Sequence, residues 1–337
     1  MVESNQNIDT IEDKAQGCMF GLFIGDSLGS YLEGFKTKLS SQQVETAMKM
    51  PGAGKSLGAP GQCTDDTEMC MTLMHALLEC KGSYDLQVVT RWYGKYQAAP
   101  HMLNESTSLK AIRFFDEKDP DPVLARKFAA ENNSNSNSAL MRIAPLAIWC
   151  HKLSVEDLGE AVRTEVMFTH GIKMVSNVVI TFCVAVKELL TVPATDPSRR
   201  QKTYEIAMNT AKKLECPETI SYLELASKFA TDQKITQSGE FKPSSHSSMF
   251  HTKVGFIFAF YFLLRVDLAD DCLFDTCMRE ICIMGGDTDT NCAIAGAMVG
   301  AYLGYSKLPG EKVRAIVEMD PSKGIQGERP AFIVPND

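Results

Sequence analysis

Glycine recurs at every fourth position near the start of the chain, and this spacing strongly limits how the chain can fold. The row consists of Gly17, Gly21, Gly25 and Gly29. If the segment is helical, each glycine costs ~1 kcal/mol relative to alanine, so the row needs a compensating role. A close helix crossing supplies that role, because small side chains let two backbones approach. The alternative is a flexible loop, but core-type residues such as Met19 and Phe23 occupy the positions between the glycines.

A second row of small residues stands near the other end of the chain. Its members are Gly296, Gly300 and Gly304, flanked by Ala293, Ala297 and Ala301. Both rows repeat every four residues, so each forms a ridge along one face of a helix. We therefore predict that helices around residues 17–29 and 293–304 pack directly against each other.

The composition is that of a soluble globular protein with a sizeable core. The 337 residues are 45% hydrophobic and 23% charged, with a net charge of −8. The acidic balance argues against a general nucleic-acid surface, because phosphate backbones bind basic patches. The most apolar runs, near residues 175–186 and 255–264, are shorter than the ~20 residues of a membrane-spanning helix, so we predict buried core helices.

The eleven cysteines include no Cys-x-x-Cys pair, and several lie in apolar helical runs. This pattern indicates reduced, buried thiols in an intracellular protein. The polar N-terminal sequence lacks the pattern of a signal peptide. We expect a cytoplasmic monomer without membrane contact, with the nucleus as an alternative location.

Periodic apolar residues predict helices throughout the chain and no strand. The predicted helices cover residues 11–35, 69–79, 84–98, 105–116, 121–131, 139–149, 154–168, 172–192, 198–215, 217–230, 250–266, 270–284, 287–301 and 309–319. The polar stretch 231–249 is the longest predicted loop, either a lid or a disordered segment. The predicted fold is all-α, one domain over residues 1–337, with a core of about 11–319 and irregular ends at 1–10 and 320–337.

Two acidic segments stand immediately before apolar helices. They are Thr64-Asp65-Asp66-Thr67-Glu68 and Asp287-Thr288-Asp289-Thr290. Carboxylate and hydroxyl oxygens suit hard cations such as Mg²⁺, and paired aspartates can bridge two ions. The alternative is that these residues cap helices, since Asp65 and Glu68 have the spacing of a capping box. If the two segments converge, they would form a carboxylate site for two metal ions.

A run of only asparagine and serine, residues 132–138, precedes another apolar segment. Its backbone amides could hold an anion at a helix start. Arg142 is an isolated cation in that apolar segment, and it either assists such a site or forms an internal salt bridge. His170 stands at a helix junction, where a lone histidine is commonly a structural hydrogen-bonding residue.

Five motifs resemble those of the ADP-ribosylglycohydrolase family, occur in the family's order and span residues 17–304. They are Gly25-Asp26-Ser27-Leu28-Gly29 with Glu33, Thr64-Asp65-Asp66-Thr67, Asn137-Ser138-Ala139-Leu140-Met141-Arg142, Thr169-His170 and Gly286-Asp287-Thr288-Asp289-Thr290. The resemblance implies an orthogonal helical bundle that holds two Mg²⁺ ions, with Mn²⁺ as an alternative. By motif match, the metal ligands would be Thr64, Asp65, Asp66, Asp287, Asp289 and Thr290.

The resemblance also implies catalytic and substrate-binding residues. The candidate catalytic residues are Asp26, Glu33, Asp66 and Asp289. The candidate substrate-binding residues are Ser134, Asn135, Ser136, Asn137, Ser138 and His170. The family usually has glycine where this chain has Ser138, and an added Cβ restricts the backbone beside a bound diphosphate.

The implied reaction is hydrolysis of the bond between C1″ of the distal ribose and a modified protein or peptide side chain, which releases ADP-ribose. The transition state would carry oxocarbenium character, which nearby carboxylates stabilise. The motifs leave Ser-linked and Arg-linked substrates open. The alternatives are hydrolysis of a free ADP-ribose derivative, such as the O-acetyl ester, and an inactive, crystallin-like structural or binding protein.

Overall fold

The computed structural model describes residues 9–35, 39–52, 58–101, 107–236, 241–324 and 329–335. These residues form fifteen α-helices joined by loops and short 3-10 turns, and no β-strand occurs among them. The predicted all-α class is therefore confirmed. The helices are α1 (Ile11–Gly29), α2 (Ser41–Ala47), α3 (Asp65–Glu79), α4 (Leu86–Ala98), α5 (Thr107–Ile112), α6 (Pro122–Asn132), α7 (Ala144–Trp149), α8 (Val155–Val166), α9 (Lys173–Thr191), α10 (Arg199–Lys213), α11 (Pro217–Thr231), α12 (Thr252–Leu263), α13 (Asp270–Met284), α14 (Thr288–Leu303) and α15 (Gly310–Val317).

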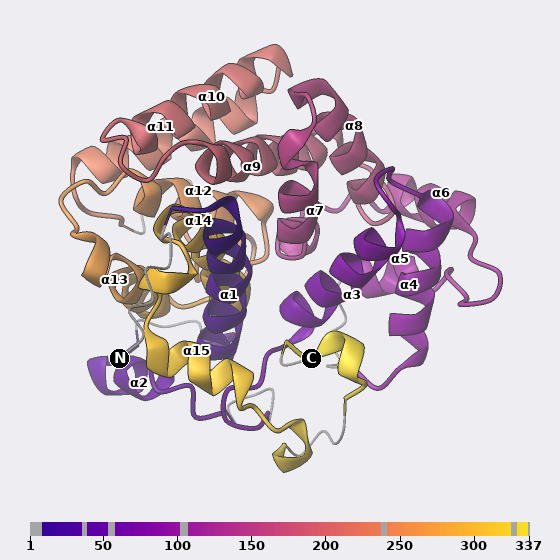
Figure 1. The fold of residues 1–337 in the computed structure, drawn as a ribbon, viewed down its shortest axis with the longest axis horizontal. Coiled ribbons are helices and arrows are strands. Elements are labelled where there is room, and N and C mark those ends of the chain that lie inside the picture. The colour runs from indigo at the N-terminus through magenta and orange to yellow at the C-terminus, as the bar shows by residue number, and fades with distance from the viewer. Residues whose placement is uncertain are drawn as a thin grey trace, which may run out of the picture.

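Helices α1 and α14 lie side by side in the middle of the fold (Figure 1) and make the most extensive contact between two described helices. A Cβ added to Gly21 would overlap the carbonyl of Gly296, and a Cβ added to Gly300 would overlap the carbonyl of Gly17. The predicted pairing of the two small-residue rows is therefore confirmed.

The close approach of the two backbones continues past the predicted glycines to the first turn of α14. Gly25 faces the backbone of Cys292, and Gly29 faces that of Thr288. The hydroxyl of Thr288 also donates a hydrogen bond of 2.7 Å to the carbonyl of Gly29. The end of α1 is thus aligned with the beginning of α14, which brings Asp26 toward the second acidic segment.

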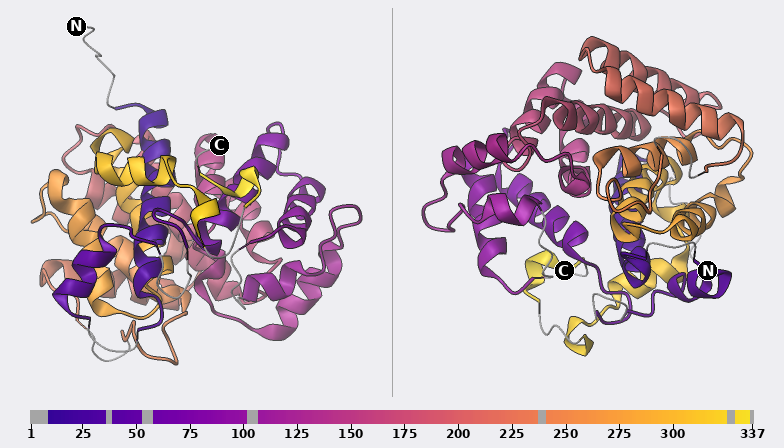
Figure 2. Two further views of the ribbon diagram at one scale, coloured as in Figure 1. Left: turned by 90° about the horizontal axis from the view of Figure 1, so that it is seen from below. Right: turned by 180° about the vertical axis from the view of Figure 1, so that it is seen from behind.

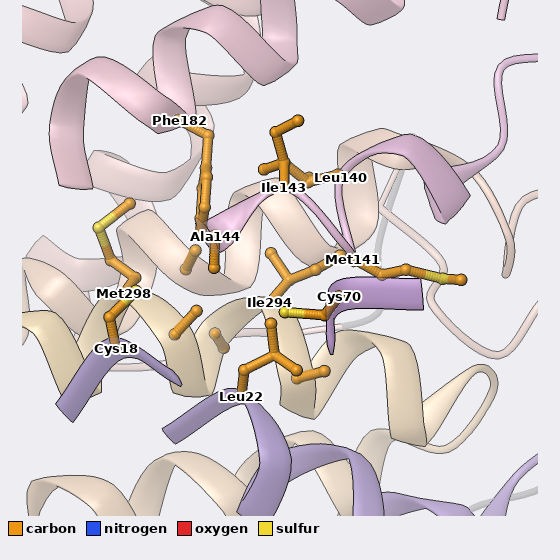
Figure 3. Packing of buried hydrophobic residues seen from close by; sticks show 14 of the residues in the cluster. Cys18, Leu22, Cys70, Leu140, Met141, Ile143, Ala144, Phe182, Ile294 and Met298 are labelled. Atoms are coloured by element: carbon orange, nitrogen blue, oxygen red, sulfur yellow. The ribbon is translucent and has the colours of Figure 1, made fainter. Parts of the chain in front are cut away.

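The hydrophobic core surrounds this helix pair. Figure 3 shows Leu22 of α1, Ile294 and Met298 of α14 and Phe182 of α9 in one buried cluster. At 19 residues, α9 is the one described helix long and apolar enough to cross a membrane, but 78% of its most apolar window is buried inside the protein. Its bounds agree with the predicted helix at 172–192 to within one residue at each end, and its place in the buried core is confirmed.

Peripheral helices cover the central ones. Helices α10 and α11 pair along one edge, and α4, α5 and α6 gather at another (Figure 2). The predicted helix 139–149 was wrong at its start, because α7 begins at Ala144 after a 3-10 turn at Asn137–Ala139. Pro145 explains the difference: it has no N–H to donate to the carbonyl four residues earlier, so it belongs in the first turn of a helix.

Some predictions fall outside the described residues. These are the irregular ends at 1–8, 325–328 and 336–337, and part of the predicted loop at 237–240. The described part of the C-terminal end contains 3-10 turns at Pro321–Lys323 and Ala331–Ile333, and the second turn contacts α3.

Candidate metal and substrate site

Asp26, in the last turn of α1, caps the N-terminus of α3. Its carboxylate accepts hydrogen bonds from the backbone N–H groups of Thr64 (2.9 Å) and Thr67 (3.1 Å) and from their hydroxyls (2.7 and 2.5 Å). The side chain of Thr64, the N-cap residue of α3, makes no capping bond of its own. Burial raises the pKa of Asp26 to about 6, against the effect of these hydrogen bonds. Asp26 thus fixes the turn that carries Asp65 and Asp66.

The start of α14 is tied to the segment that follows α1. Gly286 adopts a φ of 91°, in the left-handed region that favours glycine. The N–H of Gly34 donates to the Gly286 carbonyl (2.8 Å), and the N–H of Gly286 donates to the Phe35 carbonyl (3.0 Å). This pairing brings together carboxylate oxygens that all lie within 4.8 Å of one another, from Glu33, Asp287 and Asp289.

The two predicted acidic segments converge in the interior. Asp65, Asp66, Asp287 and Asp289 are each no more than 4% exposed. Burial and neighbouring carboxylates raise the pKa of Asp66 and Asp289 well above the usual value, and burial raises that of Asp287 to about 7. Within the described ranges, no ion pair with Lys, Arg or His neutralises Asp66, Asp287 or Asp289.

These features fit a hard divalent cation. Asp66 Oδ1 is buried and has no hydrogen-bond partner in the described part of the chain. Two hydroxyls complete the oxygen-rich surroundings: Thr64 Oγ1 lies 3.3 Å from Asp66 Oδ2, and the Thr290 side chain hydrogen-bonds to Asp66. The charge of Asp65 acts on both Asp66 and Asp287. The charges of Asp65 and Asp66 thus act on the carboxylates of α14, and carboxylate and hydroxyl donors of this kind suit Mg²⁺, Mn²⁺ or Ca²⁺. That all six predicted residues ligate metal stays a prediction.

The predicted substrate loop is bonded to this cluster through Asn137. The Asn137 side-chain amide donates to Asp287 Oδ2 at 2.5 Å, and its backbone N–H donates to the Phe250 carbonyl at 2.8 Å. The carbonyl of Asn135 accepts from the N–H of Thr252 at 2.9 Å. The loop is thus held between the acidic cluster and the start of α12. Among the predicted substrate-binding residues, Asn135 is exposed and Ser134 and Ser136 are half-buried, so these three remain accessible.

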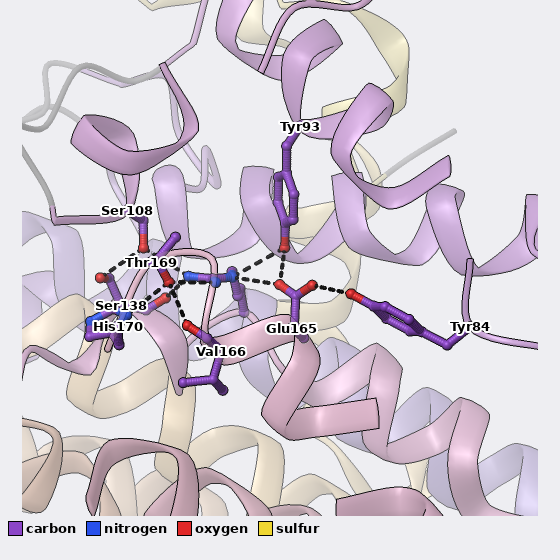
Figure 4. A network of polar contacts seen from close by, with 9 residues as sticks. Tyr84, Tyr93, Ser108, Ser138, Glu165, Val166, Thr169 and His170 are labelled. Atoms are coloured by element: carbon purple, nitrogen blue, oxygen red, sulfur yellow. Dashed lines mark hydrogen bonds and ion pairs between the residues drawn. The ribbon is translucent and has the colours of Figure 1, made fainter. Parts of the chain in front are cut away.

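A buried polar network lies behind this loop, and Figure 4 shows Ser108, Ser138, Glu165 and Thr169 gathered in it. Arg142 bonds to all four of these residues. Its Nε lies 3.1 Å from Glu165 Oε1, and both side chains are fully buried. Its Nη1 donates to the Ser108 hydroxyl (2.8 Å) and to the Ser138 carbonyl (2.7 Å), and its Nη2 donates to the Thr169 hydroxyl (2.9 Å). The interpretation of Arg142 as half of an internal salt bridge is confirmed.

His170 belongs to the same network. Its Nδ1 lies 2.8 Å from the Thr169 hydroxyl, and its Nε2 lies 2.8 Å from the Ser136 hydroxyl. Burial, with the charge of Arg142, lowers the pKa of His170 to about 3, so the ring is neutral. Because the side chain is fully buried and both nitrogens are engaged, His170 is placed to orient Ser136 and not to face solvent.

Ser138 joins the network through its hydroxyl. Ser138 Oγ lies 2.9 Å from Ser108 Oγ and 3.1 Å from Ser136 Oγ. The extra side chain that we expected to restrict the loop is therefore used to anchor it. The sequence did not single out Ser108, Glu165 or the two hydrogen bonds that Thr67 donates to Asp26. Thr67 lies inside a motif that was identified, whereas nothing in the local sequence marks Ser108 or Glu165.

The structure thus defines an all-α protein with a buried acidic cluster that could hold a metal ion. The pattern of the ADP-ribosylglycohydrolase family matches residues 7–327. The chain therefore belongs to the ADP-ribosylglycohydrolase family, whose members are glycosidases that act on ADP-ribose linkages.

Relatives and solved structures agree with this assignment. The ADP-ribosyl-(dinitrogen reductase) glycohydrolase of Rhodospirillum rubrum is 24% identical over 303 residues, which cover 89% of each chain. The ADP-ribosylhydrolase ARH3 of Xenopus tropicalis is 24% identical over 317 residues, 87% of this chain and 88% of the relative. A solved ADP-ribosylglycohydrolase-related protein complex has the same fold, with a TM-score of 0.67, 22% identity and coverage of 90% and 92%.

Proposed function

We propose that this protein hydrolyses the glycosidic bond between C1″ of ADP-ribose and a protein side chain, in a Mg²⁺-dependent reaction that releases ADP-ribose. The observation that carries the proposal is the group of Glu33, Asp287 and Asp289, whose carboxylate oxygens lie within 4.8 Å of one another, in a chain of this family. The buried carboxylate of Asp66 adds its charge to this group. A water-attack reaction at a sugar carbon needs a positioned water and negative charge near the developing oxocarbenium ion. The carboxylates would supply the negative charge and could accept a hydrogen bond from the water.

Two Mg²⁺ ions, or Mn²⁺ in their place, would be held by Thr64, Asp65, Asp66, Asp287, Asp289 and Thr290. When bound, the ions would supply positive charge that orients the ribose hydroxyls and a water. Asp26 takes a positioning role in this scheme, since both of its oxygens are engaged by Thr64 and Thr67.

Glu33 is the proposed catalytic base. Its carboxylate borders Asp287 and Asp289 but is more exposed than either, which supports a role in contact with an incoming water. It would accept the proton of the attacking water and return it to the leaving side chain. The carboxylates around C1″ would stabilise the positive charge that develops as the bond breaks.

The Asn/Ser loop is the proposed binding site for the rest of ADP-ribose. Ser134, Asn135 and Ser136 offer accessible amide and hydroxyl donors to the diphosphate, and Asn137 links that contact to Asp287. His170 and Ser138 support the loop from behind. Local donors of this kind explain how a protein with a net charge of −8 would bind an anionic ligand.

We propose that the substrate is an ADP-ribosylated protein or peptide inside the cell, and that this protein acts on it as a monomer.

Two peptides of matched sequence, one Ser-linked and one Arg-linked, would be incubated with the protein and Mg²⁺, with and without EDTA. Mass spectrometry should detect free ADP-ribose from one or both peptides, only when Mg²⁺ is present. Unimpaired release by an Asp66→Ala, Asp289→Ala double variant would falsify the proposal, as would turnover of O-acetyl-ADP-ribose alone.

A further inference from the structure

The C-terminal residues 329–335, here called the C-terminal strap, lie against α3 and α4. Figure 1 places the C-terminal end beside α3, and the turn Ala331–Ile333 contacts that helix. The Phe332 ring packs edge-on against Trp92 of α4, with centroids 5.6 Å apart. Lys95 Nζ lies over both rings, at 4.4 Å from Trp92 and 4.5 Å from Phe332. The strap is therefore docked by specific contacts, although its sequence gave no sign of them.

The strap delivers a buried cation to the first turn of α3. Arg329 Nε lies 2.9 Å from Glu68 Oε1, and the two side chains are 3% and 4% exposed. The other oxygen of Glu68 accepts a hydrogen bond from the Tyr96 hydroxyl at 3.2 Å. The backbone N–H of Glu68 donates to the Thr64 carbonyl at 3.1 Å, so Glu68 belongs to the turn that carries Thr64, Asp65 and Asp66.

This turn is held from two sides. Asp26 of α1 accepts hydrogen bonds from the backbone N–H groups of Thr64 and Thr67. Arg329 forms an ion pair with the Glu68 carboxylate in the same first turn of α3. A buried carboxylate that loses its cation is strongly destabilising, because burial removes the water that would otherwise solvate the charge. Without Arg329, the buried Glu68 carboxylate would lose its paired charge, which would destabilise the turn that carries the predicted metal ligands.

We propose that the C-terminal strap positions the α3 half of the cation site, and that Arg329 is a positioning residue that acts through Glu68. The inference rests on the cation site of the proposed function but not on its substrate. It adds a residue that contacts no predicted ligand directly and acts on the ligands through the turn that Glu68 belongs to.

The test measures Mn²⁺ binding to the full chain by titration calorimetry and by electron paramagnetic resonance. Arg329→Met should weaken Mn²⁺ binding measurably, by up to about tenfold, the low end of the range for partners that contact metal ligands directly. The double variant Arg329→Met, Glu68→Gln should recover most of this loss, since it removes both charges and leaves no unpaired carboxylate. If Arg329 acted only through its positive charge, Arg329→Met would tighten Mn²⁺ binding, because the variant removes a cation that repels the metal ion.

Two controls separate positioning from general loss of stability. Lys323→Met removes an exposed lysine whose partner is Asp320, and it should leave Mn²⁺ binding unchanged. Leu223→Ala on α11 lowers the melting temperature through a buried site away from the strap, and it should not change Mn²⁺ affinity in the folded protein. Unchanged or tighter binding in Arg329→Met, or no recovery in the double variant, overturns the proposal.

The outcome also distinguishes this inference from the proposed function. If the unaltered chain binds Mn²⁺ with the predicted dependence on Arg329 but hydrolyses neither peptide, the strap proposal stands and the proposed activity fails. If the unaltered chain binds no Mn²⁺, both proposals fail.

Discussion

The side-chain amide of Asn137 lies 2.5 Å from Asp287 Oδ2, and this hydrogen bond joins the predicted substrate loop to the predicted metal site. The two residues are 150 positions apart in the sequence. Because one oxygen of Asp287 is held by an amide, the carboxylate has a fixed orientation toward the rest of the cluster. Binding of ligand at the loop and of cation at the cluster should therefore be coupled.

Removing this amide should weaken both functions of the site. Asn137→Ala should raise the Kd for Mn²⁺ by about 10-fold or more, since it frees Asp287 from an outer partner. Titration calorimetry measures the change. The matched control is Asn135→Ala, whose exposed side chain has no contact with the cluster among the described bonds. Equal affinities in the two variants would show that Asn137 does not orient Asp287.

The crossing of α1 and α14 should not tolerate a methyl group. A Cβ on Gly21 would overlap the Gly296 carbonyl, and neither backbone can move without displacing the rest of its helix. Gly21→Ala should therefore reduce the free energy of unfolding by at least ~1–3 kcal/mol, as in overpacked cores. Urea denaturation followed by circular dichroism measures this loss.

Gly159 in α8 is the control for helix propensity. A Cβ there would meet only the side chain of Ile180, at an ordinary contact distance of 3.7 Å. Gly159→Ala should stabilise the protein by up to ~1 kcal/mol, because alanine favours the helix. If both substitutions change stability in the same direction, the close approach of α1 and α14 is not the reason why position 21 requires glycine.

His170 should make the protein less stable in acid. Its folded-state pKa of about 3 lies below the unfolded value of 6.5, so the unfolded chain binds the proton more readily. The stabilisation is complete above the unfolded value and is lost as the pH falls from 6.5 toward 3. At pH 5 the loss is about 2 kcal/mol, from 1.36 kcal/mol per pH unit.

The comparison with His170→Gln isolates this effect. Glutamine keeps hydrogen-bonding groups but does not titrate, so the stability difference between the variant and the unaltered chain should shift in favour of the variant below pH 6.5. Chemical denaturation at pH 5 and pH 7.5 measures the difference. His246→Gln, at an exposed histidine, should leave the pH profile as it was. A constant difference between His170→Gln and the unaltered chain at both pH values would contradict the prediction.

Removing the metal should destabilise the protein more at high pH than at low pH. Without metal, burial raises the pKa of Asp287 to about 7, and burial with neighbouring carboxylates raises those of Asp66 and Asp289 well above the usual value. A carboxylate with a raised folded-state pKa contributes full stability below its unfolded value, and that contribution is lost as the pH rises through the folded value. EDTA should therefore lower the Tm more at pH 8 than at pH 5.5, measured by differential scanning fluorimetry. The reverse order would argue against a cation among these aspartates.

The helix pair at the centre of the fold could be predicted because helical spacing alone places Gly17–Gly29 and Gly296–Gly304 on single faces. Predicting that Asp66 and Asp289 converge also required the resemblance to the ADP-ribosylglycohydrolase family. The local sequence is equally compatible with two separate helix caps. The capping of α3 by Asp26 could not be predicted, because it depends on how two distant helices cross. The same is true of Glu165, whose importance comes entirely from its position against Arg142.

The contact between α1 and α14 also has a consequence for synthesis of the chain. Asp26 and Thr64 leave the ribosome early, but α14 and its aspartates follow more than 200 residues later. During that interval the glycine face of α1 has no partner and would expose apolar surface. Contacts of such long sequence separation slow folding, so the nascent chain should depend on chaperones until α14 has been made. The acidic centre is then completed late, when both halves already have their supporting helices.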